Sequence, residues 1–149
     1  MNYKILVKDF AKRTNINLRI IEKNKICGNE SYEVTQLINS CLGLLVFPRE
    51  KFFNSIPETQ IEELEKQGWV IPEVSGNFPQ VENLKQLLRY LRNAIAHFNI
   101  EFISDSEDQI QTIKVWNNYR GRKTWEAILG IEELKSILEK FTELIDEKF

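Results

Sequence analysis

One run of residues organises this sequence: Leu84-Lys-Gln-Leu-Leu-Arg-Tyr-Leu-Arg-Asn-Ala-Ile-Ala-His-Phe98. On a helical wheel of ~100° per residue, its apolar side chains lie within ~60° of Leu91 and form a continuous stripe. The stripe consists of Leu84, Leu87, Leu88, Ala94, Ile95 and Phe98. The opposite side carries Lys85, Arg89, Arg92, Asn93, Ala96 and His97. The spacing predicts a helix over about residues 80–99 that buries one face and presents cations, an amide and an imidazole on the other.

Helical spacing recurs on both sides of this run, and a strand-like period follows it. Helices are predicted over residues 3–13, 31–47, 59–67 and 131–147, with loops over 15–29 and 69–79. Two strands are predicted over residues 100–102 and 110–116, with a turn at 104–108 between them. A second turn is predicted at 117–121, and a third strand over 124–129. The sequence therefore predicts one domain over residues 1–149, of mainly α class: a helical bundle with a small antiparallel β-hairpin insertion before the last helix.

The composition excludes several functional classes. The chain has 149 residues and a formal net charge of −2, so its overall charge does not indicate a nucleic-acid-binding protein. Its single histidine excludes any site that needs two imidazoles from one chain, and its two cysteines are too few for a disulfide framework. The N-terminus lacks the apolar core of a signal peptide, and the longest apolar stretch, residues 41–47, is far too short to span a membrane. We therefore expect a cytoplasmic protein with no membrane association and no metal or other cofactor.

Charge is distributed unevenly along the chain. Residues 1–25 hold seven basic and two acidic residues, whereas residues 126–149 hold seven acidic and three basic ones. A nearly neutral chain with this asymmetry can still present a basic surface, although a mixed, solvated exterior explains the same counts.

The polar face of the central helix has two interpretations. Lysine and arginine commonly cover the solvated side of an amphipathic helix, which requires no function. Two features favour a functional site instead. Ala96 leaves a flat place in the polar arc where another backbone could approach, and Asn93 lies one turn before His97, where its amide could orient the imidazole.

The segment Leu91-Arg-Asn-Ala-Ile-Ala-His-Phe98 resembles the signature of the HEPN superfamily, the higher eukaryotes and prokaryotes nucleotide-binding domain. The mark of that superfamily is an arginine, four further residues and then a histidine, commonly with asparagine directly after the arginine. The longer segment from Leu88 to Phe102 is similar to a small bacterial HEPN branch. The resemblance implies a HEPN-like helical bundle and a metal-independent endoribonuclease that acts as a dimer, with two motif helices facing each other across a two-fold axis.

These residue types suit cleavage of RNA without a metal ion. The 2′-OH of RNA is the nucleophile, so His97 needs only to remove its proton or to protonate the leaving 5′-oxygen. Arg92 offers a fork of donors to the phosphorane, and Asn93 would orient the imidazole or a phosphate oxygen. On an ideal helix Arg92 and His97 point ~140° apart, so two copies paired around Ala96 would form the shared cleft that one copy cannot. We therefore predict Arg92, Asn93 and His97 as catalytic residues, with RNA and a second copy of the chain as partners.

Residues 114–125 form a second candidate RNA contact, with four basic residues, three aromatic residues and no acidic residue. Exposed aromatic rings beside cations can stack unpaired bases and bind phosphates. Alternatively, Trp116 and Trp125 pack inward as cross-strand partners and only the turn is basic. The predicted substrate-binding residues, on this turn and on the central helix, are Lys85, Arg89, Tyr119, Arg120 and Arg122.

The resemblance further implies a toxin or antiphage-defence effector, for which an antitoxin or other regulatory protein is a candidate partner. The alternative is a non-catalytic HEPN-like module that binds nucleic acid or a partner protein and dimerises. In the HEPN branch paired with nucleotidyltransferase antitoxins, a tyrosine two residues after the histidine accepts AMP. This chain has Asn99 at that position, so adenylylation there is not expected.

Overall fold

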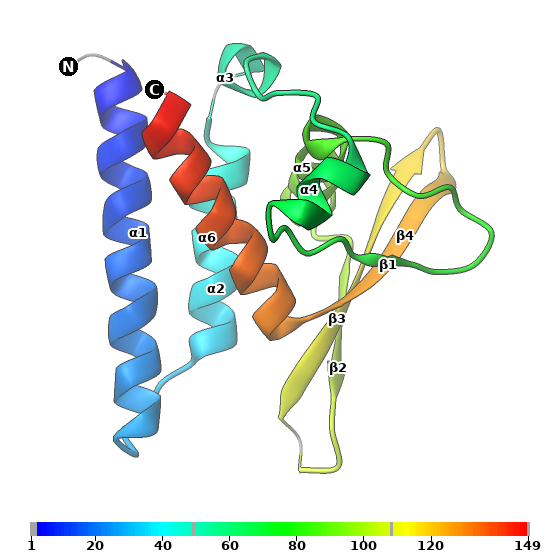
Figure 1. Ribbon diagram of the computed structural model, residues 1–149. Helices are drawn as coiled ribbons and strands as arrows, with labels where there is room; N and C mark the ends of the chain where they lie inside the picture. The colour runs from blue at the N-terminus through cyan, green and yellow to red at the C-terminus, as the bar shows by residue number, and fades with distance from the viewer. Residues whose placement is uncertain (1–2, 49, 108, 149) are drawn as a thin grey trace.

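The computed structural model describes residues 3–48, 50–107 and 109–148, and its elements form layers (Figure 1). An antiparallel sheet lies on one side, and the helices α5 (Leu84–Ala96) and α6 (Ile131–Lys148) pack against it. α1 (Tyr3–Ile26) and α2 (Glu33–Cys41) lie side by side, and both contact α6. Buried side chains from these elements form one hydrophobic core. Among the described residues, no helix is both long enough and apolar enough to cross a lipid bilayer.

The first helix extends from Tyr3 to Ile26, so the prediction that it stops at residue 13 and is followed by a loop over 15–29 is wrong. Ala11, Thr14 and Leu18 are buried at spacings of three and four residues, which continues one face of the helix through the polar stretch. This face packs against α2 and α6. The helix therefore owes its second half to tertiary packing that the local sequence does not reveal.

The predicted helix over 31–47 is confirmed, but its last turn is wider than an α-helix. α2 continues directly into the π-helix η1 (Leu42–Val46), which ends before Pro48. A Cβ on Gly43 would lie 2.5 Å from Cε1 of Phe10, so a glycine at this position lets α1 approach η1 closely. η1 in turn packs against α5.

Two short helices lie between η1 and α5. α3 (Glu50–Asn54), which the sequence did not predict, carries the buried residues Phe52 and Phe53. α4 (Ile61–Lys66) lies within the helix predicted over 59–67. It ends as expected at Gly68, whose φ of 79° suits a helix C′ residue.

The sheet is larger than the sequence predicted. β1 (Glu73–Val74), β2 (Ile100–Ser104), β3 (Ile110–Tyr119) and β4 (Arg122–Gly130) form a four-stranded antiparallel sheet in the order β1-β4-β3-β2. The prediction of a mainly α bundle with a small β-hairpin insertion is therefore wrong, and the described chain is an α+β domain.

Two parts of this sheet, β1 and the end of β3, lie in segments for which the sequence predicts no strand. β1 lies in the proline-rich stretch 69–79 that was predicted to be a loop, and it pairs with β4, which is distant in sequence. β3 runs through residues 117–119, which were assigned to a turn. The actual turn is at Arg120 and Gly121, which both have positive φ, 49° and 76°. Positive φ at both central residues is characteristic of the type I′ turn, which is common in tight two-residue hairpins.

The two faces of the sheet have different surroundings. Ile113, Val115, Trp125, Ala127 and Leu129 alternate along β3 and β4 and are buried. The opposite face carries partly exposed side chains and an ion pair of 2.9 Å between Lys114 and Glu101. The buried face lies against α5 and α6, and α6 matches the predicted helix over 131–147 closely.

Candidate functional site

α5 holds the HEPN-like motif on a well-defined helix. Asn83 caps its N-terminus, because its Oδ1 accepts a hydrogen bond of 3.0 Å from the Gln86 N–H. The apolar stripe is buried as predicted over Leu84, Leu87, Leu88, Leu91, Ala94 and Ile95. Because this stripe packs on η1 and β3, it fixes the direction in which the polar face points.

The end of α5 differs from the prediction. The Phe98 N–H donates to the Ile95 carbonyl at 3.1 Å, and the Asn99 N–H donates to the Ala94 carbonyl at 2.8 Å. These two bonds, with a φ of 53° at Phe98, form a Schellman-type cap. The expectation that Phe98 belongs to the buried stripe is wrong, because the left-handed residue follows the end of the helix and its side chain is 66% exposed.

His97 is the C-cap residue of α5, and its side chain is exposed. Its backbone N–H donates to the Asn93 carbonyl at 3.1 Å. Asn93 is half-buried, and Ala96 is exposed between the two polar residues. The flat place expected at Ala96 is therefore accessible to another molecule. Orientation of the imidazole by the Asn93 amide stays a prediction.

Arg92 is half-buried and directed toward α3. Its Cζ lies 4.8 Å from the centroid of the Phe53 ring, a cation–π contact of the kind that contributes ~0.5–2 kcal/mol. Phe53 is fully buried, and its ring lies 6.4 Å from that of Phe141 on α6. Sequence analysis missed Phe53, because nothing local indicates that α3 meets the motif helix. Within one chain, Arg92 thus contacts α3 while His97 faces solvent.

Lys85 and Arg89 lie toward the N-terminal end of the same helix, beside a polar cavity of about 470 Å³. Lys85 forms an ion pair of 3.1 Å with Glu58, and Nη2 of Arg89 donates to Oδ1 of Asn54 at 3.4 Å. The cavity is also lined by Asn83, Gln86 and Tyr90. The structure therefore brings these two predicted substrate-binding residues together in one hollow.

The other predicted contacts lie at the β3–β4 turn. Tyr119 is 64% exposed, and the centroid of the Tyr119 ring lies 5.2 Å from Cζ of Arg120. Arg122 is also exposed. Arg120 lies at the tip of the hairpin, because it forms the turn between β3 and β4 together with Gly121.

The two tryptophans are not cross-strand partners. Trp116 pairs with Glu126 and Trp125 with Asn117, so the two rings lie on opposite faces of the sheet. Trp125 is buried and lies 5.1 Å from the Tyr90 ring, measured between ring centroids. Trp116 is partly exposed, with the Lys123 ammonium 5.1 Å from its ring centroid.

Hydrogen bonds connect α5 and the segment that follows it to β3. The Trp116 N–H donates to the Asn99 carbonyl at 3.2 Å, and Asn117 Nδ2 donates to the Tyr90 carbonyl at 3.2 Å. Tyr119 follows Trp116 by three residues, or ~10 Å of extended strand. The hairpin tip and the end of the motif helix are therefore parts of one hydrogen-bonded unit.

A larger cavity, about 780 Å³, lies between α1, α6 and the ends of β3 and β4 and contains none of the motif residues. Its charged side chains are paired with one another: Lys25 with Glu33, and Lys135 with Glu22. The hydrogen bond that the Lys135 ammonium donates to the Glu22 carboxylate raises the pKa of Lys135 above its ordinary value. Within the described ranges, no three His, Cys, Asp or Glu side chains are grouped so that they could hold a metal ion.

Arg92, Asn93 and His97 thus lie at the end of a helix that packs against other helices and an antiparallel sheet. The family model described as HEPN pEK499 p136 matches residues 1–149. The chain therefore belongs to this HEPN family. No curated protein and no solved structure gives a significant match.

Proposed function

We propose that this HEPN domain is an endoribonuclease that needs no metal ion and acts as a homodimer. The observation that supports it best is the arrangement of side chains at the end of α5. Ala96 and His97 are exposed there, and Arg92, about one turn earlier, points away from them toward Phe53 on α3. The catalytic residues in this proposal are Arg92, Asn93 and His97.

The proposed reaction uses the RNA itself as the nucleophile. A base removes the proton of the 2′-OH, the 2′-oxygen forms a bond to phosphorus, and the bond from phosphorus to the 5′-oxygen breaks. An acid returns a proton to that 5′-oxygen. The products are a 2′,3′-cyclic phosphate and a 5′-OH, and the Arg92 guanidinium stabilises the added negative charge of the phosphorane.

A dimer fits the directions of the two side chains, because within one chain Arg92 contacts α3 while His97 faces solvent. In each site, His97 of one copy would remove the 2′-OH proton and then return it to the 5′-oxygen, and Arg92 would come from the other copy. Contact around Ala96 would also bring the Arg92 of one copy toward the His97 of the other. The proposed cleft therefore lies between protomers.

The cationic residues outside the motif, together with Tyr119, are proposed to bind the flanking RNA. Lys85 and Arg89 line one cavity, and Tyr119, Arg120 and Arg122 lie at the hairpin tip. Their side chains can bind phosphates without reading the base sequence. An effector of this kind would cleave transcripts in toxin–antitoxin or antiphage systems, under restraint by a regulatory protein.

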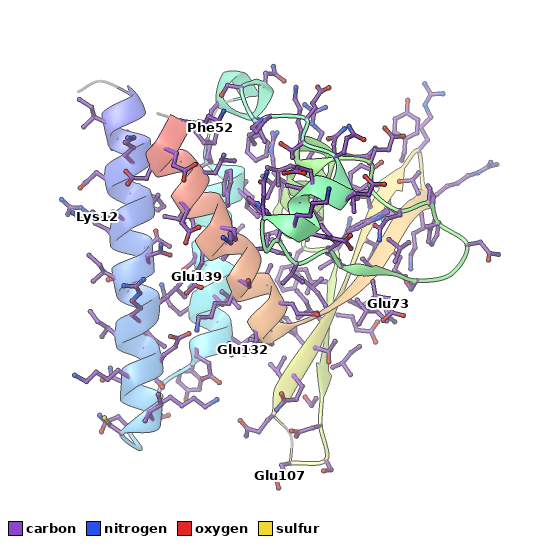
Figure 2. All side chains as sticks on the ribbon, in the orientation of Figure 1. Lys12, Phe52, Glu73, Glu107, Glu132 and Glu139 are labelled. Carbon is purple, nitrogen blue, oxygen red and sulfur yellow. The ribbon has the colours of Figure 1, made fainter. Side chains whose placement is uncertain are left out.

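The test is cleavage of a fluorogenic single-stranded RNA in excess EDTA. His97→Gln replaces the imidazole with a polar amide that cannot transfer protons. We expect the cleavage rate of this variant to be roughly 10²- to 10⁴-fold lower than that of the wild type. Arg92→Lys keeps the charge but loses the planar fork and should also lose activity. Lys12→Ala, on the far side of the molecule on α1, is the matched control and should cleave at the wild-type rate (Figure 2).

Two outcomes would contradict the proposal. If His97→Gln cleaves like the wild type, the imidazole has no catalytic role. If purified wild-type protein binds RNA but leaves it intact, the chain is the non-catalytic module. A terminal phosphate that phosphatase removes only after acid treatment identifies the 2′,3′-cyclic end that this route predicts.

A further inference from the structure

Phe98 combines two unusual properties at the end of the motif helix. Its φ is 53°, in the left-handed region that glycine usually occupies at this position of a helix cap, and its ring is 66% exposed. Only Arg120 shares a positive φ among the other described non-glycine residues. A side chain with a Cβ is disfavoured in this conformation, so glycine would suit the backbone better.

The fold nevertheless holds Phe98 firmly in place. On the side of the helix, the two hydrogen bonds of the Schellman cap, of 3.1 and 2.8 Å, fix the backbone of Phe98. On the other side, the Trp116 N–H donates a hydrogen bond to the carbonyl of the next residue, Asn99. Ile100 then pairs with Val115 in the sheet. The backbone that carries the ring is therefore fixed directly after His97, and the exposed ring contributes little to the core.

We infer that Phe98 is a stacking platform for a base of the RNA strand, next to the phosphate that His97 acts on. This inference rests on the proposed function, and it assigns to the site a residue that contacts the base rather than the reacting phosphate. An aromatic ring can stack on any of the four bases, because each base has a π-face. Phe98 would thus position the strand without selecting its sequence.

The surroundings of Phe98 favour a nucleic acid over a second protein chain as the occupant. His97 and Asn99 on either side are polar, and a base places polar edges around a flat apolar face. Exposed aliphatic side chains gather elsewhere, on α1, at Ile5, Ile16 and Ile20. An aromatic ring within a polar surface, beside an imidazole, matches a nucleotide better than it matches an apolar protein interface.

The test measures binding without cleavage. The probes are a fluorescein-labelled 12-mer of 2′-O-methyluridine, which lacks the nucleophile, and a 12-mer of abasic tetrahydrofuran spacers with the same phosphates. We expect Phe98→Gly to weaken binding of the uridine oligomer roughly 5- to 150-fold and to leave binding of the abasic oligomer unchanged. Phe98→Trp should bind the uridine oligomer at least as tightly as the wild type.

A matched control separates stacking from the loss of any exposed ring. Phe47 is 76% exposed with an ordinary φ of −68°, and Phe47→Ala should leave both affinities unchanged. Phe98→Gly should also unfold at an equal or higher denaturant concentration than the wild type, since glycine suits this backbone. A structural role for the ring predicts the opposite shift.

Three results would overturn the inference. Phe98→Gly could bind the uridine oligomer like the wild type, or lose affinity equally for both oligomers. It could instead dissociate into monomers in sedimentation experiments, which would make Phe98 an anchor between copies. If wild-type protein shows the predicted binding but cleaves no RNA, the proposed nuclease fails while the stacking site stands. If His97-dependent cleavage is found but Phe98→Gly binds normally, only the stacking site fails.

Discussion

The guanidinium carbon of Arg92 lies 4.8 Å from the centroid of the Phe53 ring. Phe53 belongs to α3 and is fully buried, so this contact connects the arginine of the motif helix to the core. A guanidinium held on a buried ring has fewer conformations to lose when it meets a phosphate. The position of the arginine is therefore set by packing outside the motif.

We predict that Phe53→Leu lowers the cleavage rate by more than its loss of stability explains. The smaller side chain should destabilise the fold by ~1–2 kcal/mol and also release Arg92, so cleavage by the folded protein should fall roughly tenfold. The control is Phe141→Leu, which makes the same change in the same aromatic cluster on α6. Both variants should lose similar stability in urea, and only Phe53→Leu should lose cleavage. An equal loss of cleavage in the two variants would show that the ring under Arg92 has no special role.

A cleft shared between two chains predicts that two inactive variants regain cleavage activity when they form mixed dimers. Arg92→Ala and His97→Ala homodimers should each be inactive, but a heterodimer places one intact arginine opposite one intact histidine. Random exchange of subunits should return about a quarter of the wild-type activity, because half of the dimers are mixed and each has one complete site. The measurement is the cleavage rate before and after the two proteins are mixed. No recovery despite proven exchange would place both residues of a site in the same chain.

The hairpin tip should contribute to the salt dependence of RNA binding. Each phosphate contact on a single strand contributes about 0.7 to the slope of log K against log salt concentration. Arg120→Ala with Arg122→Ala should therefore lower that slope by about 1.4. Lys12→Ala on α1 should leave it unchanged. Equal slopes in the double variant and the wild type would remove the hairpin tip from the RNA-binding surface.

Glu126 should make part of the stability depend on acidic pH. Hydrogen bonds from Lys123 and from the Ser75 hydroxyl, the latter at 2.5 Å, lower the pKa of Glu126 below its ordinary value near 4.5. A lowered pKa means that the carboxylate stabilises the fold at pH values above about 4.5, and that this contribution is lost as the pH falls through the native pKa.

Glu126→Gln should therefore melt about 2–4 °C below the wild type at pH 7, and the difference should shrink below pH 4. Glu107→Gln is the control, at the tip of the β2–β3 hairpin (Figure 2). Thermal melting of the three proteins between pH 3 and pH 7 tests this. A difference that stays constant across that range would show that Glu126 does not stabilise the fold through its charge.

Local patterns predicted the helices that bury a continuous face, and they failed where burial depends on distant partners. The 3.6-residue period was clear in α5 and α6, whose apolar stripes are complete within the segment. Residues 15–29 are predicted to be a loop because the stretch is polar and contains Gly28, yet Leu18 within it is buried as part of the core. β1 has only two residues and exists because β4 offers it an edge, which no local period can indicate.

The motif residues could be found from sequence because they share one helix, where spacing fixes relative direction. Order and period single out Arg92, Asn93 and His97 on one helix, and the resemblance of that segment to the HEPN signature indicates the family that the family model over residues 1–149 confirms. Only the folded chain decided that Arg92 lies on Phe53, and that the helix ends at Ala96 so that His97 and Phe98 emerge from the core. The physical reason is that periodicity records which side of a segment is apolar. The partner that covers this side, and the point at which the helix stops, depend on contacts between residues that are far apart in the chain.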